Sequence, residues 1–176
     1  MTGTPPVFPR RQVALKQSSP RDGIEKAMIP TDQDFEARVR SSFGRQQAMA
    51  LLGAEMTAVQ AGMTEITLPF RDALTQQHGF VHAGIITAIA DSACGYAALS
   101  LMPPDVGVLT IEFKVNLLNP AAGERFVARG RVVKPGRTIM VCTGEVVAER
   151  ADGGQQTVAL IQATMMVVRD RPTVSD

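Results

Sequence analysis

A long apolar segment that follows a short polar loop constrains the fold of this chain more than any other feature of its sequence. The loop, residues 76–84, holds both histidines of the protein, and residues 83–101 then run on without a proline. At about 100° per residue, the apolar side chains of this segment cover nearly its whole circumference, which is typical of a helix buried on all sides. The sequence therefore predicts one long buried helix over residues 83–101.

Asp91 is the one charged residue within this predicted helix. Burying a carboxylate costs free energy unless it is hydrogen-bonded or has a functional role. The segment is about as long as a membrane span, but its many small residues and Asp91 argue against membrane insertion. Two interpretations of Asp91 stay open: a functional acid, or a structural acid that a nearby hydroxyl such as that of Thr87 satisfies.

The composition favours a single-domain cytoplasmic protein. A chain of 176 residues is long enough for one domain with one hydrophobic core. Its net charge of +1 lacks the strongly basic footprint of nucleic-acid binding. Cys94 and Cys142 lie far apart within apolar segments and match neither a redox motif nor a zinc spacing. We expect both to be reduced core residues, and we expect no metal and no other cofactor.

Both ends of the chain differ from the middle. Residues 1–30 are rich in proline and carry five basic residues against two acidic ones, which is typical of an extended tail. The pair Arg10-Arg11 resembles a twin-arginine signal, but no apolar stretch follows it, so export is not expected. The tail is either a solvated extension or an arm that wraps a partner subunit. Residues 31–170 form the predicted domain, and residues 171–176 form a polar tail.

Other elements follow from periodicity and from turn residues. Thr31 is the expected cap of a helix on which Phe35, Val39 and Phe43 recur at helical spacing, and a second helical turn runs to about residue 52. Residues 54–61 and 63–70 form a predicted hairpin around a glycine, with Ile66, Leu68 and Phe70 pointing inward. Four further strands are expected over residues 106–118, 124–134, 137–150 and 155–168, joined in order as an antiparallel meander.

The predicted fold class is therefore α+β, with an antiparallel sheet of about six strands wrapped around one long buried helix. In the strand 106–118, alternation places Thr110 on one face with Glu112 and Lys114, and the apolar residues on the other. Such a sheet leaves an edge strand uncovered, and a second copy of the chain could cover it. We expect a homodimer, with a dimer of dimers as the alternative.

The loop and the predicted helix together contain a motif of spaced residues. It consists of Gln76, Gly79, His82-Ala83-Gly84 and Ile89-Ala90-Asp91-Ser92-Ala93. This pattern resembles that of the PaaI-like hotdog-fold acyl-CoA thioesterase family, whose motif is an Asn, two residues, Gly, two residues and His-Gly-Gly, and then a helix with Leu-x-Asp-x-Ala. The strand 108–121 and the Gly136-Arg137 turn also resemble the family, so the similarity covers about residues 45–168. Two positions depart from it: Gln76 stands for Asn, and Ala83 stands for the middle Gly.

The resemblance implies a hotdog fold and the hydrolysis of acyl-CoA thioesters, and the residues suggest how. The N–H groups of Ala83 and Gly84 are free donors at the positive end of a helix dipole, where they could polarise a thioester carbonyl. Desolvation should raise the pKa of Asp91, which suits a base. Asp91 could activate water or attack the carbonyl directly, and the sequence does not decide between the two.

Other residues have both a substrate-binding and a structural interpretation. Gln76 and His82 could contact the substrate, although His82 could equally be a packing residue at the helix start. Thr110 matches the position where relatives place a hydroxyl near the water, and is otherwise an ordinary strand threonine. Lys134 and Arg137 could meet the phosphates of CoA or form a solvated turn. From a different functional class, the chain could be a non-catalytic acyl-CoA-binding protein on the same fold.

The position of Asp91 predicts that two subunits share each site. Asp91 lies seven to nine residues after the polarising groups at residues 82–84. That is roughly 10–13 Å along a helix, whereas reacting atoms must approach within about 3–3.5 Å. Two antiparallel copies of the helix would place the N-terminus of one beside the middle of the other. We therefore expect two equivalent sites in each dimer.

Overall fold

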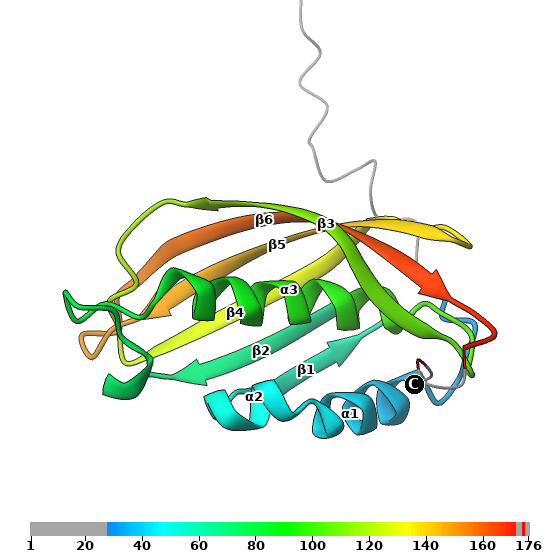
Figure 1. The fold of residues 1–176 in the computed structure, drawn as a ribbon, viewed down its shortest axis with the longest axis horizontal. Helices are drawn as coiled ribbons and strands as arrows, with labels where there is room; N and C mark the ends of the chain where they lie inside the picture. Colours follow the sequence, from blue (N-terminus) through cyan, green and yellow to red (C-terminus); the bar gives the residue numbers. More distant parts are fainter. Residues whose placement is uncertain (1–27, 172–173, 175–176) are drawn as a thin grey trace, which may run out of the picture.

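The computed structural model describes residues 28–171 and 174, in which a curved sheet encloses a long helix (Figure 1). The helices are α1 (Phe35–Arg45), α2 (Gln47–Leu52), the short 3-10 helix η1 (Asp72–Leu74) and α3 (Ala83–Leu99). The strands are β1 (Glu55–Gln60), β2 (Met63–Pro69), β3 (Gly107–Leu117), β4 (Arg125–Lys134), β5 (Ile139–Glu149) and β6 (Gln155–Val168). Residues 1–27, most of the predicted N-terminal tail, lie outside the described part, as do 172–173 and 175–176.

Helix α3 is the predicted buried helix, and the sheet curves around it (Figure 1). Its apolar residues are buried on several sides, with Ile86, Ile89 and Leu99 each at most 1% exposed. The sheet approaches α3 closely at Gly130 of β4, where an added Cβ would lie 2.3 Å from the carbonyl carbon of Ala93. The helix ends two residues earlier than predicted, where the Ser100 hydroxyl donates to the Ala97 carbonyl at 2.7 Å.

The six strands form one antiparallel sheet in the order β1-β2-β4-β5-β6-β3. The predicted four-stranded meander is therefore wrong in one pairing, because β3 pairs with β6 and not with β4. Helix α3 carries the chain across the concave face, so β3 enters at the far edge and β4 returns beside β2. The segment between β3 and β4 is held against the loop before α3, because the N–H of Val81 donates a hydrogen bond to the Ala121 carbonyl.

Two predictions for the N-terminal half are wrong in detail. Thr31 does not cap α1, because the helix begins at Phe35 and the Thr31 hydroxyl donates to the Leu101 carbonyl at 3.3 Å. Phe70 does not point into the core but is 36% exposed, because β2 ends at Pro69. The hairpin itself is confirmed, with Ile66 and Leu68 fully buried.

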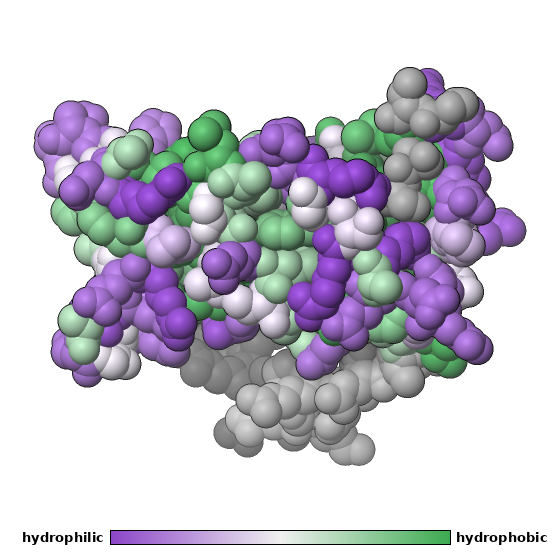
Figure 2. All heavy atoms as spheres, turned by 90° about the horizontal axis from the view of Figure 1, so that it is seen from below, coloured by the Kyte–Doolittle hydropathy of each residue, from purple (hydrophilic) through white to green (hydrophobic). Residues whose placement is uncertain are grey.

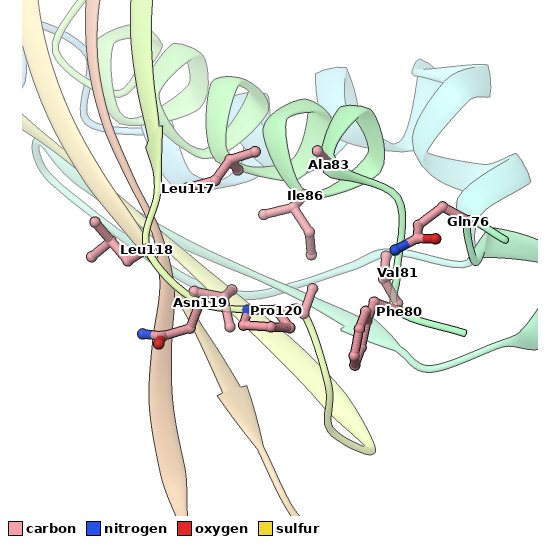
Figure 3. A pocket seen from close by; sticks show the side chains of 11 residues that line it. Gln76, Phe80, Val81, Ala83, Ile86, Leu117, Leu118, Asn119 and Pro120 are labelled. Atoms are coloured by element: carbon pink, nitrogen blue, oxygen red, sulfur yellow. The ribbon is translucent and has the colours of Figure 1, made fainter. Parts of the chain in front are cut away.

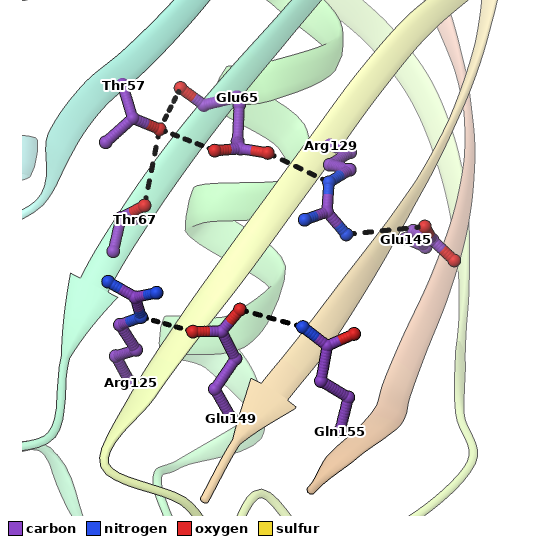
Figure 4. Close-up of polar contacts among 8 residues, drawn as sticks. All are labelled: Thr57, Glu65, Thr67, Arg125, Arg129, Glu145, Glu149 and Gln155. Atoms are coloured by element: carbon purple, nitrogen blue, oxygen red, sulfur yellow. Dashed lines mark hydrogen bonds and ion pairs between the residues drawn. The ribbon is translucent and has the colours of Figure 1, made fainter. Parts of the chain in front are cut away.

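Charged side chains form ion pairs on the face of the sheet that points away from α3 (Figure 4). Arg129 of β4 pairs with Glu65 of β2 at 2.9 Å and with Glu145 of β5 at 3.8 Å. Arg125 and Glu149 form a second pair across β4 and β5. Directly opposed charges of this kind support the register of neighbouring strands. The core therefore lies on the α3 side, where both cysteines are fully buried and free, as the sequence predicts.

Helices α1 and α2 lie along one side of the molecule, and α1 packs against both α3 and β1. On the face seen in Figure 2, hydrophilic atoms are interspersed with smaller apolar areas. Within the part of the chain that the structure describes, no helix combines the length and the apolar character needed to cross a lipid bilayer.

Candidate active site

The start of α3 presents one unpaired backbone donor. His82 is the residue that caps the helix, and its Nδ1 accepts a hydrogen bond from the Gly84 N–H at 2.9 Å. Among the described residues, the N–H of Ala83 has no acceptor. Of the two predicted polarising groups, the Ala83 N–H is therefore the one free to bind a ligand at the positive end of the helix dipole.

The loop before α3 is held by its own hydrogen bonds. The N–H of His78 donates to the Gln76 side-chain oxygen at 2.5 Å, and the Gln76 N–H donates to the Phe80 carbonyl at 2.8 Å. The His82 N–H donates to the Leu74 carbonyl at 2.9 Å. These bonds fix the backbone that leads into Ala83, so the free N–H points in a defined direction.

Gln76 and Ala83 line a cavity of about 430 Å³, which we call the apolar cavity (Figure 3). Apart from Gln76 and Asn119, its side chains are apolar, and none of them is charged. They come from the loop, the first turn of α3, the end of β3 with the segment after it, and β6, and they include Phe80, Ile86, Leu117 and Val158. The Asn119 amide is already engaged, since it donates to the Thr157 carbonyl at 2.8 Å. The cavity therefore suits an uncharged apolar group.

Asp91 lies further along α3 and bonds to a different strand. Its Oδ1 accepts a hydrogen bond from the Thr110 hydroxyl of β3 at 2.8 Å. Its Oδ2 has no hydrogen-bond partner among the described residues. Partial burial raises the pKa of Asp91 above the ordinary value, and the hydrogen bond from Thr110 opposes that rise. One oxygen is thus held in place while the other is available, as a general base requires.

Thr110 reaches Asp91 because β3 contains a bulge. The register against β6 shifts between Thr110 and Glu112, so Ile111 is an extra residue on the β3 side. Thr110 and Phe113 therefore face α3, and Glu112 faces away and accepts from the Thr164 hydroxyl. The prediction that Thr110 shares a face with Glu112 is wrong, because strict alternation takes no account of a bulge.

A second cavity, of about 340 Å³, lies beside Asp91, and we call it the Asp91 cavity. Its lining is mostly polar and includes Gln46, Ser92, Tyr96 and Thr110. Gln46 lies between α1 and α2, and its amide contacts Ser92 and Tyr96 of α3. Sequence reasoning missed Gln46, since only the packing of α1 against α3 brings it to this cavity. The break between the two helices was visible, but it did not indicate which side chain faces inward.

Within one subunit, the Ala83 N–H and Asp91 belong to different cavities. Eight residues of α3 separate them, which corresponds to roughly 12 Å along the helix. The described part of one chain thus contains both a free N–H donor and a carboxylate with an unpaired oxygen, but it does not bring them to the same point.

The chain matches a known family across the segment that carries these groups. The family model described as Thioesterase superfamily matches residues 78–154. A solved thioesterase family protein from Silicibacter pomeroyi is 52% identical, with a TM-score of 0.75, over 77% of this chain and 98% of that one. This protein belongs to the thioesterase superfamily.

One further relative supports this membership, and a second solved structure supports the fold. A protein of Halobacterium salinarum named as a candidate esterase is 31% identical over 144 residues, which cover 78% of this chain and 95% of the relative. The PaaI protein of the E. coli phenylacetic acid degradation operon is 19% identical, with a TM-score of 0.68, over 77% of this chain and 94% of that one. The α+β hotdog fold, the resemblance to PaaI-like thioesterases and the thioester hydrolase class are thereby confirmed.

In this thioesterase, Lys134 and Arg137 lie apart from both cavities. They flank the β4–β5 turn and are exposed. Arg137 lines a third cavity, of about 520 Å³, together with Leu101, which follows α3, and Arg169, which follows β6. The Arg169 side chain donates to the Arg137 carbonyl at 3.3 Å, which places two cations at this cavity.

No metal site accompanies the thioesterase motif in the described part of the chain. There, no three His, Cys, Asp or Glu side chains come close enough together to hold a metal ion.

Proposed function

We propose that the protein hydrolyses acyl-CoA thioesters to a free acid and CoA, with Asp91 as the general base. The observation that carries the proposal is the Asp91 carboxylate, which Thr110 holds through one oxygen while the other stays unpaired beside a polar cavity. A polar cavity of this size can hold water. Desolvation keeps the pKa of Asp91 above its ordinary value, which improves a carboxylate as a base.

The proposed reaction consumes one water for each thioester. The Asp91 carboxylate removes a proton from water while the water oxygen attacks the thioester carbonyl carbon. The Ala83 N–H at the start of a helix stabilises the negative charge that forms on the carbonyl oxygen. The C–S bond then breaks, and Asp91 returns its proton to the departing thiolate, so that the products are a carboxylic acid and the CoA thiol.

The proposed site is built by two subunits, since one chain does not bring its own donor and base together. The α3-facing side of β3 supports this arrangement, because it exposes large apolar residues at the edge of the sheet. Phe113 is 45% and Leu117 is 56% exposed, although both pair with buried residues of β6. A second copy related by a two-fold axis would cover this edge and place its own Ala83 beside Asp91.

Recognition of the CoA nucleotide is proposed for the far end of α3. Lys134, Arg137 and Arg169 are exposed cations near the third cavity, and guanidinium groups suit phosphates well.

The proposal is tested by incubating the purified protein with a panel of acyl-CoAs and measuring the released thiol. The expected result is turnover that depends on Asp91. CoA binding without release of thiol for any acyl group would favour a non-catalytic acyl-CoA-binding protein.

A further inference from the structure

The Asp91 cavity contains a carboxamide that the chemistry at Asp91 leaves unused. Gln46 Nε2 donates to the Ser92 hydroxyl at 3.4 Å, and the Tyr96 hydroxyl donates to Gln46 Oε1 at 3.5 Å. Both distances exceed the usual ranges, about 2.7–3.2 Å for N–H···O and about 2.5–3.0 Å for O–H···O, so both hydrogen bonds are weak. The amide is therefore held near the cavity without strong partners, and it can exchange these contacts for a better one.

The space beside this amide is open. Gly95 follows Asp91 by one helical turn and lines the same cavity, and an added Cβ there would meet nothing within 4 Å. A ligand that approached Asp91 from this side would therefore pass over Gly95 and within reach of Gln46.

A CoA thioester has two chemically different halves, and the two cavities differ in the same way. Whatever its acyl group, the carrier arm has an amide only two methylene groups from the sulfur. The apolar cavity has no charged lining and suits the acyl half, whereas the Asp91 cavity has hydrogen-bonding side chains that suit an amide. A carboxamide both donates and accepts, so it can pair fully with an amide group.

We infer that the Asp91 cavity receives the pantetheine arm of the substrate, with Gln46 as the residue that recognises its amide nearest the sulfur. The acyl group then enters the apolar cavity of the partner subunit, which selects uncharged apolar acyl groups over acidic ones. This inference rests on the proposed function and names the half of the substrate that each cavity binds. It also places a binding residue on the segment between α1 and α2, outside the matched thioesterase segment.

The inference is tested with Gln46→Ala and four thioesters of one acyl group, carried by CoA, pantetheine, N-acetylcysteamine or propanethiol. The first three carry the amide nearest the sulfur, and the fourth has none. We expect kcat/KM to fall about three- to tenfold for the three amide-bearing thioesters and to stay unchanged for the propyl thioester. Gln47→Ala is the matched control, since Gln47 is the neighbouring residue, is exposed and lines none of the three cavities.

Several outcomes would overturn the inference. An equal loss on all four thioesters would show that Gln46 acts on the fold or on Asp91. A change in the acyl-group preference of Gln46→Ala, measured with the panel of acyl-CoAs, would place the acyl group in the Asp91 cavity. Gln46→Glu keeps the side-chain length and loses the amide donor, so it should repeat the selective loss if Gln46→Ala folds poorly.

Binding separates this inference from the proposed function. Pantetheine binding, measured by calorimetry, needs no turnover and should weaken three- to tenfold in Gln46→Ala. A wild-type protein that hydrolysed nothing would refute the proposed function, and unchanged pantetheine binding in the variant would refute the inference.

Discussion

Asp91 combines partial burial with one bonded and one unpaired carboxylate oxygen. Asp91→Asn keeps the shape and removes the base, so hydrolysis should fall by about 10²- to 10⁴-fold. Since burial disfavours the charged carboxylate, charged Asp91 costs stability at neutral pH, and this cost is relieved as the pH falls. The melting temperature of the variant at pH 7 should therefore be no lower than that of the wild type. Wild-type turnover in a folded Asp91→Asn protein would remove Asp91 from the mechanism.

The bond between Thr110 and Asp91 predicts a shift in pH dependence. Desolvation raises the pKa of Asp91, so kcat/KM should decline on the acid side at a higher pH than an exposed aspartate would give. The Thr110 hydroxyl stabilises the charged form, and Thr110→Val removes it at nearly constant shape. The acid limb of the pH profile should then move to still higher pH. An acid limb that stayed at the same pH or moved to lower pH would contradict this role of Thr110.

The cap at His82 gives a prediction about the start of α3. Because Nδ1 accepts from the Gly84 N–H, the neutral ring carries its proton on Nε2. His82→Ala leaves that N–H without its cap and should lower the free energy of unfolding by about 1 kcal/mol, measured by urea titration. His82→Asn supplies another capping oxygen and should recover most of the loss. Equal stability of the Ala and Asn variants would mean that the cap contributes nothing.

At the residue scale, the sequence indicated Asp91 and the loop before α3, because a charge inside an apolar helix and a glycine-containing motif are local signals. Gln46 gave no such signal. Its contacts Ser92 and Tyr96 lie on α3, far from Gln46 in sequence, so only tertiary packing identifies it.

At the scale of elements, α3 and all six strands follow from periodicity, whereas the pairing of β3 does not. Apolar alternation shows that a segment is a strand, but it carries no information on its neighbour in the sheet. The bulge at Ile111 was missed for a related reason: one extra residue reverses the faces beyond it, and its presence depends on β6.

Gly130 of β4, which packs against α3, and Gly95 of α3 should respond in opposite ways to replacement by alanine. A Cβ at Gly130 would lie 2.3–2.5 Å from backbone atoms of Ala93 and Cys94, so Gly130→Ala forces the sheet and helix apart. Such overpacking should cost about 1–3 kcal/mol of unfolding free energy. Gly95 lies in α3 with open space around it, so Gly95→Ala should stabilise the helix by about 0.5–1 kcal/mol. Chemical denaturation of both variants measures these changes in the free energy of unfolding. A decrease for Gly95→Ala as large as that for Gly130→Ala would contradict the prediction.

At the scale of the whole molecule, the exposed apolar side of β3 and the separation of Ala83 from Asp91 have one common explanation. In the proposed dimer, a subunit that pairs through β3 would cover Phe113 and Leu117 and supply the missing half of each site. The sequence predicted this sharing from the position of Asp91 along the helix. It did not indicate which edge the proposed dimer would use, because that depends on the strand order.

Mixed dimers test the shared site most directly. One chain carries Asp91→Asn, and the other carries Ala83→Pro, which removes the free N–H. Proline is favoured at the first position of a helix, and the extended backbone of His82 (φ −60°, ψ 137°) accommodates a following proline. Each variant should therefore fold, and each homodimer should be nearly inactive.

The mixed dimer, purified through a different tag on each chain, combines both intact halves in one of its two sites. Its thioesterase activity should return to about half that of the wild-type dimer. Activity no higher than that of the two inactive homodimers would contradict a site built by two subunits.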